Sequence, residues 1–202
     1  MNPPYGSPPP AQGMSKIGVA FLFLFIGLGV GFCGGVGATK AGSAFLSDFV
    51  SDEAAADVTH PKSHSRPGFS FKYPGNWKID ADPDLEPDHQ VNVESPGSCL
   101  TMLLLFDTPI SPATSVDSQV NAFVPKLISA PSRTPFTKWG KYTGEGMLLR
   151  GKLLGINQGS VRVFAFADEK RSFVAVEQCY DEDMGDAKPG FDLVESTFAL
   201  LP

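Results

Sequence analysis

From residue 69 onward the spacing of apolar residues predicts β-strands. From 69 to 73 aromatic side chains alternate with polar ones, which is typical of a strand with one buried face. Pro74 and Gly75 then form a turn signal before residues 77–79. We therefore expect a hairpin between the two segments.

A buried strand and a helix are expected next. Residues 90–94 alternate in the same way, whereas residues 99–106 are apolar on both faces, as in a central strand covered on each side. Thr114 or Ser115 can cap a following helix, with Asp117 in its first turn. The apolar residues at helical spacing are Val116, Val120, Phe123 and Leu127. We expect this helix to cover one face of the sheet.

The C-terminal half predicts several strands and a last helix. Four strand candidates follow one another across short turns, which favours antiparallel pairing: 136–143, 146–154, 160–167 and 172–180. Pro189 suits the first turn of a final helix with Phe191, Val194 and Phe198 on one side. Strands bracketed by helices predict an α+β fold, with an antiparallel sheet sandwiched between helices.

The N-terminal part has a different composition. Residues 1–16 contain five prolines and are expected to be a disordered tail. Residues 17–38 carry no charge, and at about 1.5 Å per residue they could cross a bilayer core of roughly 30 Å. We expect a transmembrane helix or signal anchor there, then a flexible linker at 39–66 and a globular domain at 67–202.

The membrane segment leaves alternatives open. Small residues at 36–38 and 41–43 suit signal peptidase, so cleavage is the competing interpretation. Within the segment Gly27, Gly31 and Gly35 repeat every four residues and would let two such helices pack closely, so self-association is one interpretation, and the general frequency of glycine in membrane helices is the other. We expect a single-pass membrane protein with its C-terminal domain outside the cytoplasm, although few basic residues flank the segment.

Two stretches of the domain resemble a known family. The sequence FSFKYPGNW at 69–77 and FDLVESTF at 191–198, with a helix after the core strand, is similar to the PsbP/DcrB-like superfamily over about residues 67–201. The resemblance implies an α/β/α sandwich with an antiparallel sheet. It also implies a secreted or membrane-tethered accessory protein. These motifs are structural, and nothing in them matches the photosystem subunit PsbP in particular.

Two cysteines are candidates for a disulfide. Cys99 opens one expected strand and Cys179 closes another, so antiparallel pairing would bring them to the same edge. A bond that closes such a loop would stabilise the fold by about 4.5 kcal/mol in an oxidising compartment. The alternative is two separately buried thiols.

Charge and acidic residues suggest no metal, cofactor or nucleic acid. The net charge of -6 disfavours phosphate binding. Alternating acids at 80–88 superficially resemble a calcium loop, but Leu85 and Val91 stand where Gly and Glu are needed. Residues 126–171 are rich in Lys and Arg whereas 172–202 are acidic, so the domain could be electrically two-sided.

Recognisable enzyme motifs are absent from the sequence. There is no HExxH, GxSxG, phosphate loop or CxxC, and Ser98 has no evident base. We expect no catalytic residues. The leading hypothesis is a membrane-anchored, non-catalytic extracytoplasmic domain that binds an unidentified protein partner or assists complex assembly. The alternative is a secreted or envelope protein, released by signal-peptide cleavage, that binds an ion or small ligand.

Overall fold

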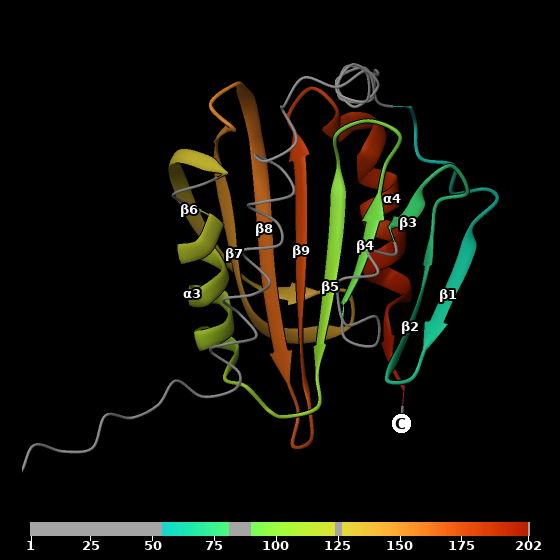
Figure 1. The fold of residues 1–202 in the computed structure, drawn as a ribbon, viewed down its shortest axis with the longest axis vertical. Helices are drawn as coiled ribbons and strands as arrows, with labels where there is room; N and C mark the ends of the chain where they lie inside the picture. Colours follow the sequence, from blue (N-terminus) through green and yellow to red (C-terminus); the bar gives the residue numbers. More distant parts are fainter. Residues whose placement is uncertain (1–53, 81–89, 124–126, 202) are drawn as a thin grey trace, which may run out of the picture. The chain divides into compact units, whose positions relative to one another are not determined.

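The computed structural model describes residues 54–80, 90–123 and 127–201 (Figure 1). The expected tail at 1–16, the expected membrane segment at 17–38 and its glycines Gly27, Gly31 and Gly35 lie outside the described residues. Neither helix in the described part of the chain is long and apolar enough to cross a membrane.

The centre of the fold is a seven-stranded antiparallel sheet with the order β3-β4-β5-β9-β8-β7-β6. Its strands are β3 (Lys78–Asp80), β4 (Gln90–Glu94), β5 (Leu100–Phe106), β6 (Ile128–Trp139), β7 (Tyr142–Leu153), β8 (Asn157–Ala167) and β9 (Ser172–Tyr180). A smaller sheet has the order β1-β2-β10. Its strands are β1 (Lys62–Arg66), β2 (Phe69–Tyr73) and β10 (Ala199–Leu200).

Two helices cover opposite faces of the large sheet. Helix α3 (Pro112–Phe123) contacts β7 and β8, and α4 (Met184–Thr197) contacts β2 and β9 (Figure 1). Alternate residues of each central strand therefore enter two different cores. The structure confirms an α+β fold with an antiparallel sheet between helices, but the small sheet shares the α4 side.

The core on the α4 side is mainly aromatic. Phe173 of β9 lies 4.7 Å from Phe198 between ring centroids, and Trp139 lies 5.3 Å from the same ring. Trp77 meets Phe191 of α4 edge to face at 5.4 Å. The aromatic residues of both segments that resemble the PsbP/DcrB-like superfamily are thus core residues, which accounts for their spacing without any chemical role.

The predicted hairpin between 69–73 and 77–79 is wrong. Strand β2 pairs with β1 and β10, whereas β3 pairs with β4 in the other sheet. The predicted linker also extends too far, because β1 lies inside 39–66. Upstream of β1, Asp57 accepts the backbone N–H of Gly75 on its carbonyl at 2.9 Å. The folded part of the chain therefore begins before residue 67.

Several element boundaries also differ from the expectation. Helix α3 begins at Pro112, before Thr114 and Ser115, because proline is well suited to the first helical position. Helix α4 begins at Met184, so Pro189 lies inside it and costs one backbone hydrogen bond. Strand β6 begins at Ile128 rather than at 136, since an exposed edge strand tolerates proline and has no need to alternate.

Gly190 allows α4 to approach the core closely, and this gives a first prediction. A Cβ built there would lie 2.5 Å from Cζ2 of Trp77, whereas one at Gly185 of the same helix meets nothing within 4 Å. We expect Gly190→Ala to lower the free energy of unfolding by about 1–3 kcal/mol through overpacking. Gly185→Ala is the control and should be neutral or stabilising. Denaturant unfolding followed by tryptophan fluorescence measures both, and equal effects of the two variants would contradict the packing argument.

Candidate functional site

Polar and reactive side chains gather in two places in the described part of the chain. The first, here called the disulfide end, comprises the loop 95–99, the β7–β8 turn at 154–156 and the β9–α4 connection at 181–183. The second is a group of charged side chains around the buried Glu177, between the large sheet and α4. We describe each from its residues upward.

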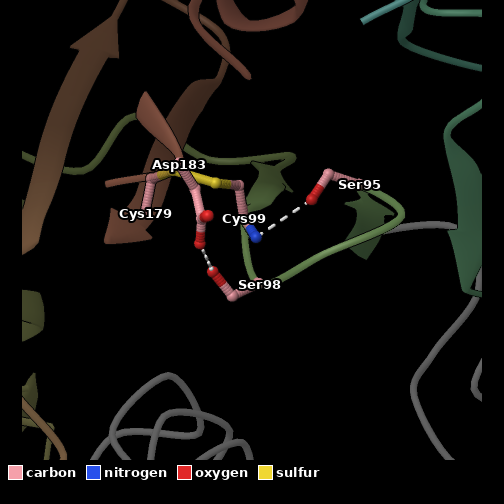
Figure 2. The surroundings of a disulfide bond; sticks show 5 residues. All are labelled: Ser95, Ser98, Cys99, Cys179 and Asp183. Atoms are coloured by element: carbon pink, nitrogen blue, oxygen red, sulfur yellow. Dashed lines mark hydrogen bonds between the residues drawn. A yellow bond between two sulfur atoms is a disulfide. The ribbon is translucent and has the colours of Figure 1, made fainter. Parts of the chain in front are cut away.

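The predicted disulfide is present at the disulfide end. Strands β5 and β9 pair with Leu100 opposite Gln178, so the next pair outward is Cys99 and Cys179. Their Cα atoms are 4.3 Å apart and their sulfur atoms are bonded (Figure 2). Both residues are buried. The bond joins neighbouring central strands and is shielded from solvent, as expected of a structural disulfide.

Hydrogen bonds connect the disulfide to the start of α4. The backbone N–H of Cys99 donates to Oγ of Ser95 at 3.0 Å, and Ser98 Oγ donates to Oδ2 of Asp183 at 2.5 Å (Figure 2). Asp183 directly precedes α4. The partner of Ser98 is thus a carboxylate that accepts its hydrogen bond, and among the described residues no histidine completes a nucleophilic arrangement of the kind used in acyl transfer. This geometry holds a loop in place.

The acids of the β9–α4 connection are occupied by protein partners. Asp181 pairs with Arg150 at 3.1 Å, and Glu182 accepts a hydrogen bond from Asn157 Nδ2 at 2.8 Å. Within 54–80, 90–123 and 127–201, no group of three or more His, Cys, Asp or Glu side chains could hold a metal ion. Apart from its first residue, the calcium-like stretch at 80–88 lies outside the described residues.

The second group surrounds the buried carboxylate of Glu177 and contains three charged side chains, from β8, β9 and α4, and Trp139 of β6. Arg162 Nη1 of β8 lies 2.6 Å from Glu177 Oε2 of β9 and 3.2 Å from Glu195 Oε2 of α4. Trp139 Nε1 of β6 donates to the other oxygen of Glu177 at 3.0 Å. Glu195 also accepts the backbone N–H of Gly140 at 2.8 Å. These contacts join α4 to the sheet.

Burial and neighbouring charges shift the pKa values of Glu177 and Arg162 in opposite directions. Glu177 is only 4% exposed, and burial raises the pKa of its carboxyl, while the charge of Arg162 and the Trp139 hydrogen bond oppose that rise. Burial lowers the pKa of Arg162, but the two carboxylates outweigh it and the pKa lies above its ordinary value. The guanidinium also lies over the ring of Phe136, 5.0 Å from its centroid.

The sequence analysis did not identify this group. Its members are far apart in sequence and follow no motif, and only Glu177 in the apolar strand SFVAVEQCY signals that a buried partner is required. The predicted two-sided charge is also partly cancelled. Arg150 and Arg162 of the basic half each pair with acids of the C-terminal part.

The comparisons with known proteins give a limited result. No protein family model matches the chain, and no curated protein matches it. A solved structure from Bacteroides thetaiotaomicron is similar at a TM-score of 0.47 and 13% identity, covering 70% of this chain and 48% of that one. This chain therefore spans about half the length of that protein.

Two further solved structures are similar. Cyanobacterial PsbP (CyanoP) from Synechocystis matches at a TM-score of 0.42 and 12% identity, covering 75% of this chain and 99% of its own. LpqN, described as involved in cell envelope biogenesis of Mycobacterium tuberculosis, matches at 0.39 and 13%, covering 71% and 92%. Likenesses of this size assign neither a family nor a function to the chain.

The buried charges give a second prediction. Arg162→Met leaves Glu177 buried without its cation, so we expect the free energy of unfolding to fall by about 3 kcal/mol at pH 7. Arg150→Met, which breaks the exposed pair with Asp181, is the control and should cost less than about 1 kcal/mol. Denaturant titrations measure both. Similar losses in the two variants would show that burial of Glu177 is not the cause.

The same variant should depend on pH in a defined direction. A carboxyl with a higher pKa in the folded than in the unfolded state holds its proton more tightly when folded. The free energy of unfolding therefore falls as the pH rises from the ordinary value of 4.5 through the raised pKa of Glu177. We expect Arg162→Met to recover stability on acidification from pH 7 towards 5, and Arg162→Met/Glu177→Gln to remove that recovery.

The disulfide gives a third prediction. In unfolded but unreduced protein, iodoacetamide should label neither Cys99 nor Cys179, because the disulfide leaves neither residue a thiol, and labelling of Cys33 serves as the positive control. The paired variant Cys99→Ala/Cys179→Ala should lower the free energy of unfolding by about 4.5 kcal/mol through the freed loop. Mass spectrometry of tryptic peptides and denaturant titration test the two parts. Alkylation of all three cysteines without reductant would show that the bond does not form.

Proposed function

We propose that the protein is a membrane-anchored, non-catalytic accessory domain of PsbP/DcrB-like type that is displayed outside the cytoplasm. In this proposal residues 17–38 hold the chain in the bilayer. The C-terminal domain binds a protein partner or assists the assembly of a complex. The domain acts through contacts rather than through chemistry.

The observation that carries the proposal is the buried disulfide. Bonds of this kind persist in oxidising compartments and are rare in the cytosol. Cys99 directly precedes the central strand β5 and Cys179 lies in the neighbouring strand β9, and both are buried, so the bond belongs to the folded core. A stable bond at this place supports a position of the domain outside the cytoplasm. The uncharged segment before it supports attachment to the membrane.

The non-catalytic role is supported by how the reactive side chains are used. Ser98 donates to a carboxylate, the cysteines are bonded to each other, and Glu177 is held by Arg162 and Trp139. Each of these groups is satisfied by a structural partner. The partner of the Ser98 hydroxyl is a carboxylate rather than the imidazole that activates a serine in acyl transfer.

One observation favours the alternative of a small-ligand binding protein. Gln119 of α3 is fully buried, and neither its amide nitrogen nor its amide oxygen has a hydrogen-bond partner. Ser115, one helical turn earlier, is also buried with an unpartnered hydroxyl. Buried polar atoms normally have partners, so a polar ligand beneath α3 would satisfy both residues. This candidate does not require a retained anchor.

Membrane extraction separates the two candidates and is the fourth prediction. We expect the full chain to stay in the membrane pellet after alkaline carbonate treatment, and an external protease to reach its C-terminal domain in intact cells. Leu24→Arg/Leu28→Arg, which places two charges in the apolar segment, should move the protein to the soluble fraction. Leu24→Val/Leu28→Val is the matched control. Release of the unaltered chain by carbonate would instead favour the secreted alternative.

A further inference from the structure

The turn between β7 and β8 has an unusual residue at its tip. Ile156 N–H donates to the carbonyl of Leu153 at 2.9 Å, which closes a β-turn with Leu154 and Gly155 at its two central positions. Their φ angles are +51° and +73°, so both lie in the left-handed region. Turns of this kind favour Asn or Asp before Gly, because a larger L side chain is strained there. Asn would therefore stabilise this turn better than Leu154 does, so the turn itself does not explain a leucine at this position.

The tip also carries exposed apolar side chains. In the described residues the exposed large hydrophobic side chains are Val58, Leu154 and Ile156, and Ile156 is the most exposed at 63%. Two of the three thus lie within this single turn. A strained backbone that presents aliphatic side chains to solvent is expected where those side chains contact something outside the domain.

The tip is held in a fixed position. Strands β7 and β8 remain paired up to Leu153 and Asn157, directly at the turn. The backbone N–H of Leu154 donates to the carbonyl of Leu127 at 2.7 Å, and Asn157 donates to Glu182 at 2.8 Å. The apolar side chains are therefore presented by a supported hairpin, which limits the entropy lost when they bind.

The described chain begins at the same end of the domain. The backbone N–H of Ala56 donates to the carbonyl of Asp186, near the start of α4, and the backbone N–H of Asp181 donates to the carbonyl of Gln158, beside the turn. Figure 1 places the β7–β8 turn and the start of α4 at the upper end of the sheet, and the hydrogen bond of Ala56 holds the beginning of the described chain beside that start. Whatever precedes residue 54 thus joins the domain at the end that carries Leu154 and Ile156.

From this arrangement we propose that Leu154 and Ile156 insert into the lipid surface and dock the domain on the bilayer. The site takes lipid at the boundary between headgroups and acyl chains. This inference rests on the proposed membrane anchor. Residues 39–53, 15 in number, separate the proposed anchor from the described domain, and a chain of that length reaches at most about 54 Å when fully extended. The anchor thus keeps the domain close to the bilayer. Because the effective concentration of lipid near the domain is then high, two aliphatic side chains are sufficient for docking.

A lipid surface fits the tip better than a protein pocket does. The tip has neither the aromatic residues nor the free arginine that dominate protein interfaces. The nearby Arg150 is already paired with Asp181, and Glu182 is hydrogen bonded to Asn157. Exposed Lys152 lies on the strand just before the turn, where its ammonium group can stay among the headgroups.

A fluorescent label at the tip tests the docking site and is the fifth prediction. In a Cys33→Ser background, Ile156→Cys offers one reactive thiol because Cys99 and Cys179 are bonded. The full chain, labelled with an environment-sensitive dye, is reconstituted into phosphatidylcholine vesicles and collected by flotation. We expect blue-shifted emission and at least twofold quenching by lipids with a nitroxide near the headgroup. Lys170→Cys, in the exposed turn at the opposite end of the sheet, is the control and should remain unquenched (Figure 1).

A second variant separates lost lipid contact from misfolding. Leu154→Asn suits the left-handed turn, so the labelled protein should unfold at an equal or higher temperature while its quenching falls by at least half. Flotation with an unquenched label at 156 would overturn the docking site and leave the anchor intact. Loss of flotation would overturn both. A label that is shielded in native membranes but not in pure lipid would indicate a protein pocket and also overturn the lipid site.

Discussion

The antiparallel pairing of β5 with β9 is the constraint on which the rest of the structure depends. The two strands lie in the middle of the large sheet, and β4 and β8 are added on either side of them. The pairing closes a loop whose ends, Cys99 and Cys179, are 80 residues apart in sequence. Ordering such a loop costs entropy, which burial of apolar side chains on both faces of the pair offsets. The covalent bond makes this pairing hard to lose.

The ion pairs of Arg162 with Glu177 and Glu195 determine the position of α4 on that sheet. The aromatic core alone would tolerate small shifts of the helix, because apolar contacts have little directionality. Arg162, opposite Glu177 across β8 and β9, also reaches Glu195 on α4, and such contacts are satisfied in only one arrangement. The ion pair with Arg162 and the hydrogen bond from Trp139 offset the free-energy cost of burying Glu177, and the contact of Arg162 with Glu195 defines the position of the helix. That position brings Asp183 to Ser98 beside the disulfide.

One end of the domain therefore combines covalent and polar restraints with an exposed apolar tip. The disulfide, the Ser98 contact and the pairs made by Asp181 and Glu182 all support the β9–α4 connection. The exposed side chains of Leu154 and Ile156 stand on this rigid base. This base fixes the position of the two side chains relative to the large sheet.

Local periodicity in the sequence was sufficient for β2, β4, β5 and β9 and for the candidate pairing of Cys99 with Cys179, because alternation records which face of a strand is buried. It gave no indication of β1 or the first half of β6, since exposed strands can contain proline and charge without penalty. The partner of β2, the meeting of Trp139, Arg162 and Glu177, and the common end shared by residue 54 and the tip arise from contacts distant in sequence. Only the tertiary structure determines these contacts, because their stabilising free energy is gained only when segments distant in sequence come together.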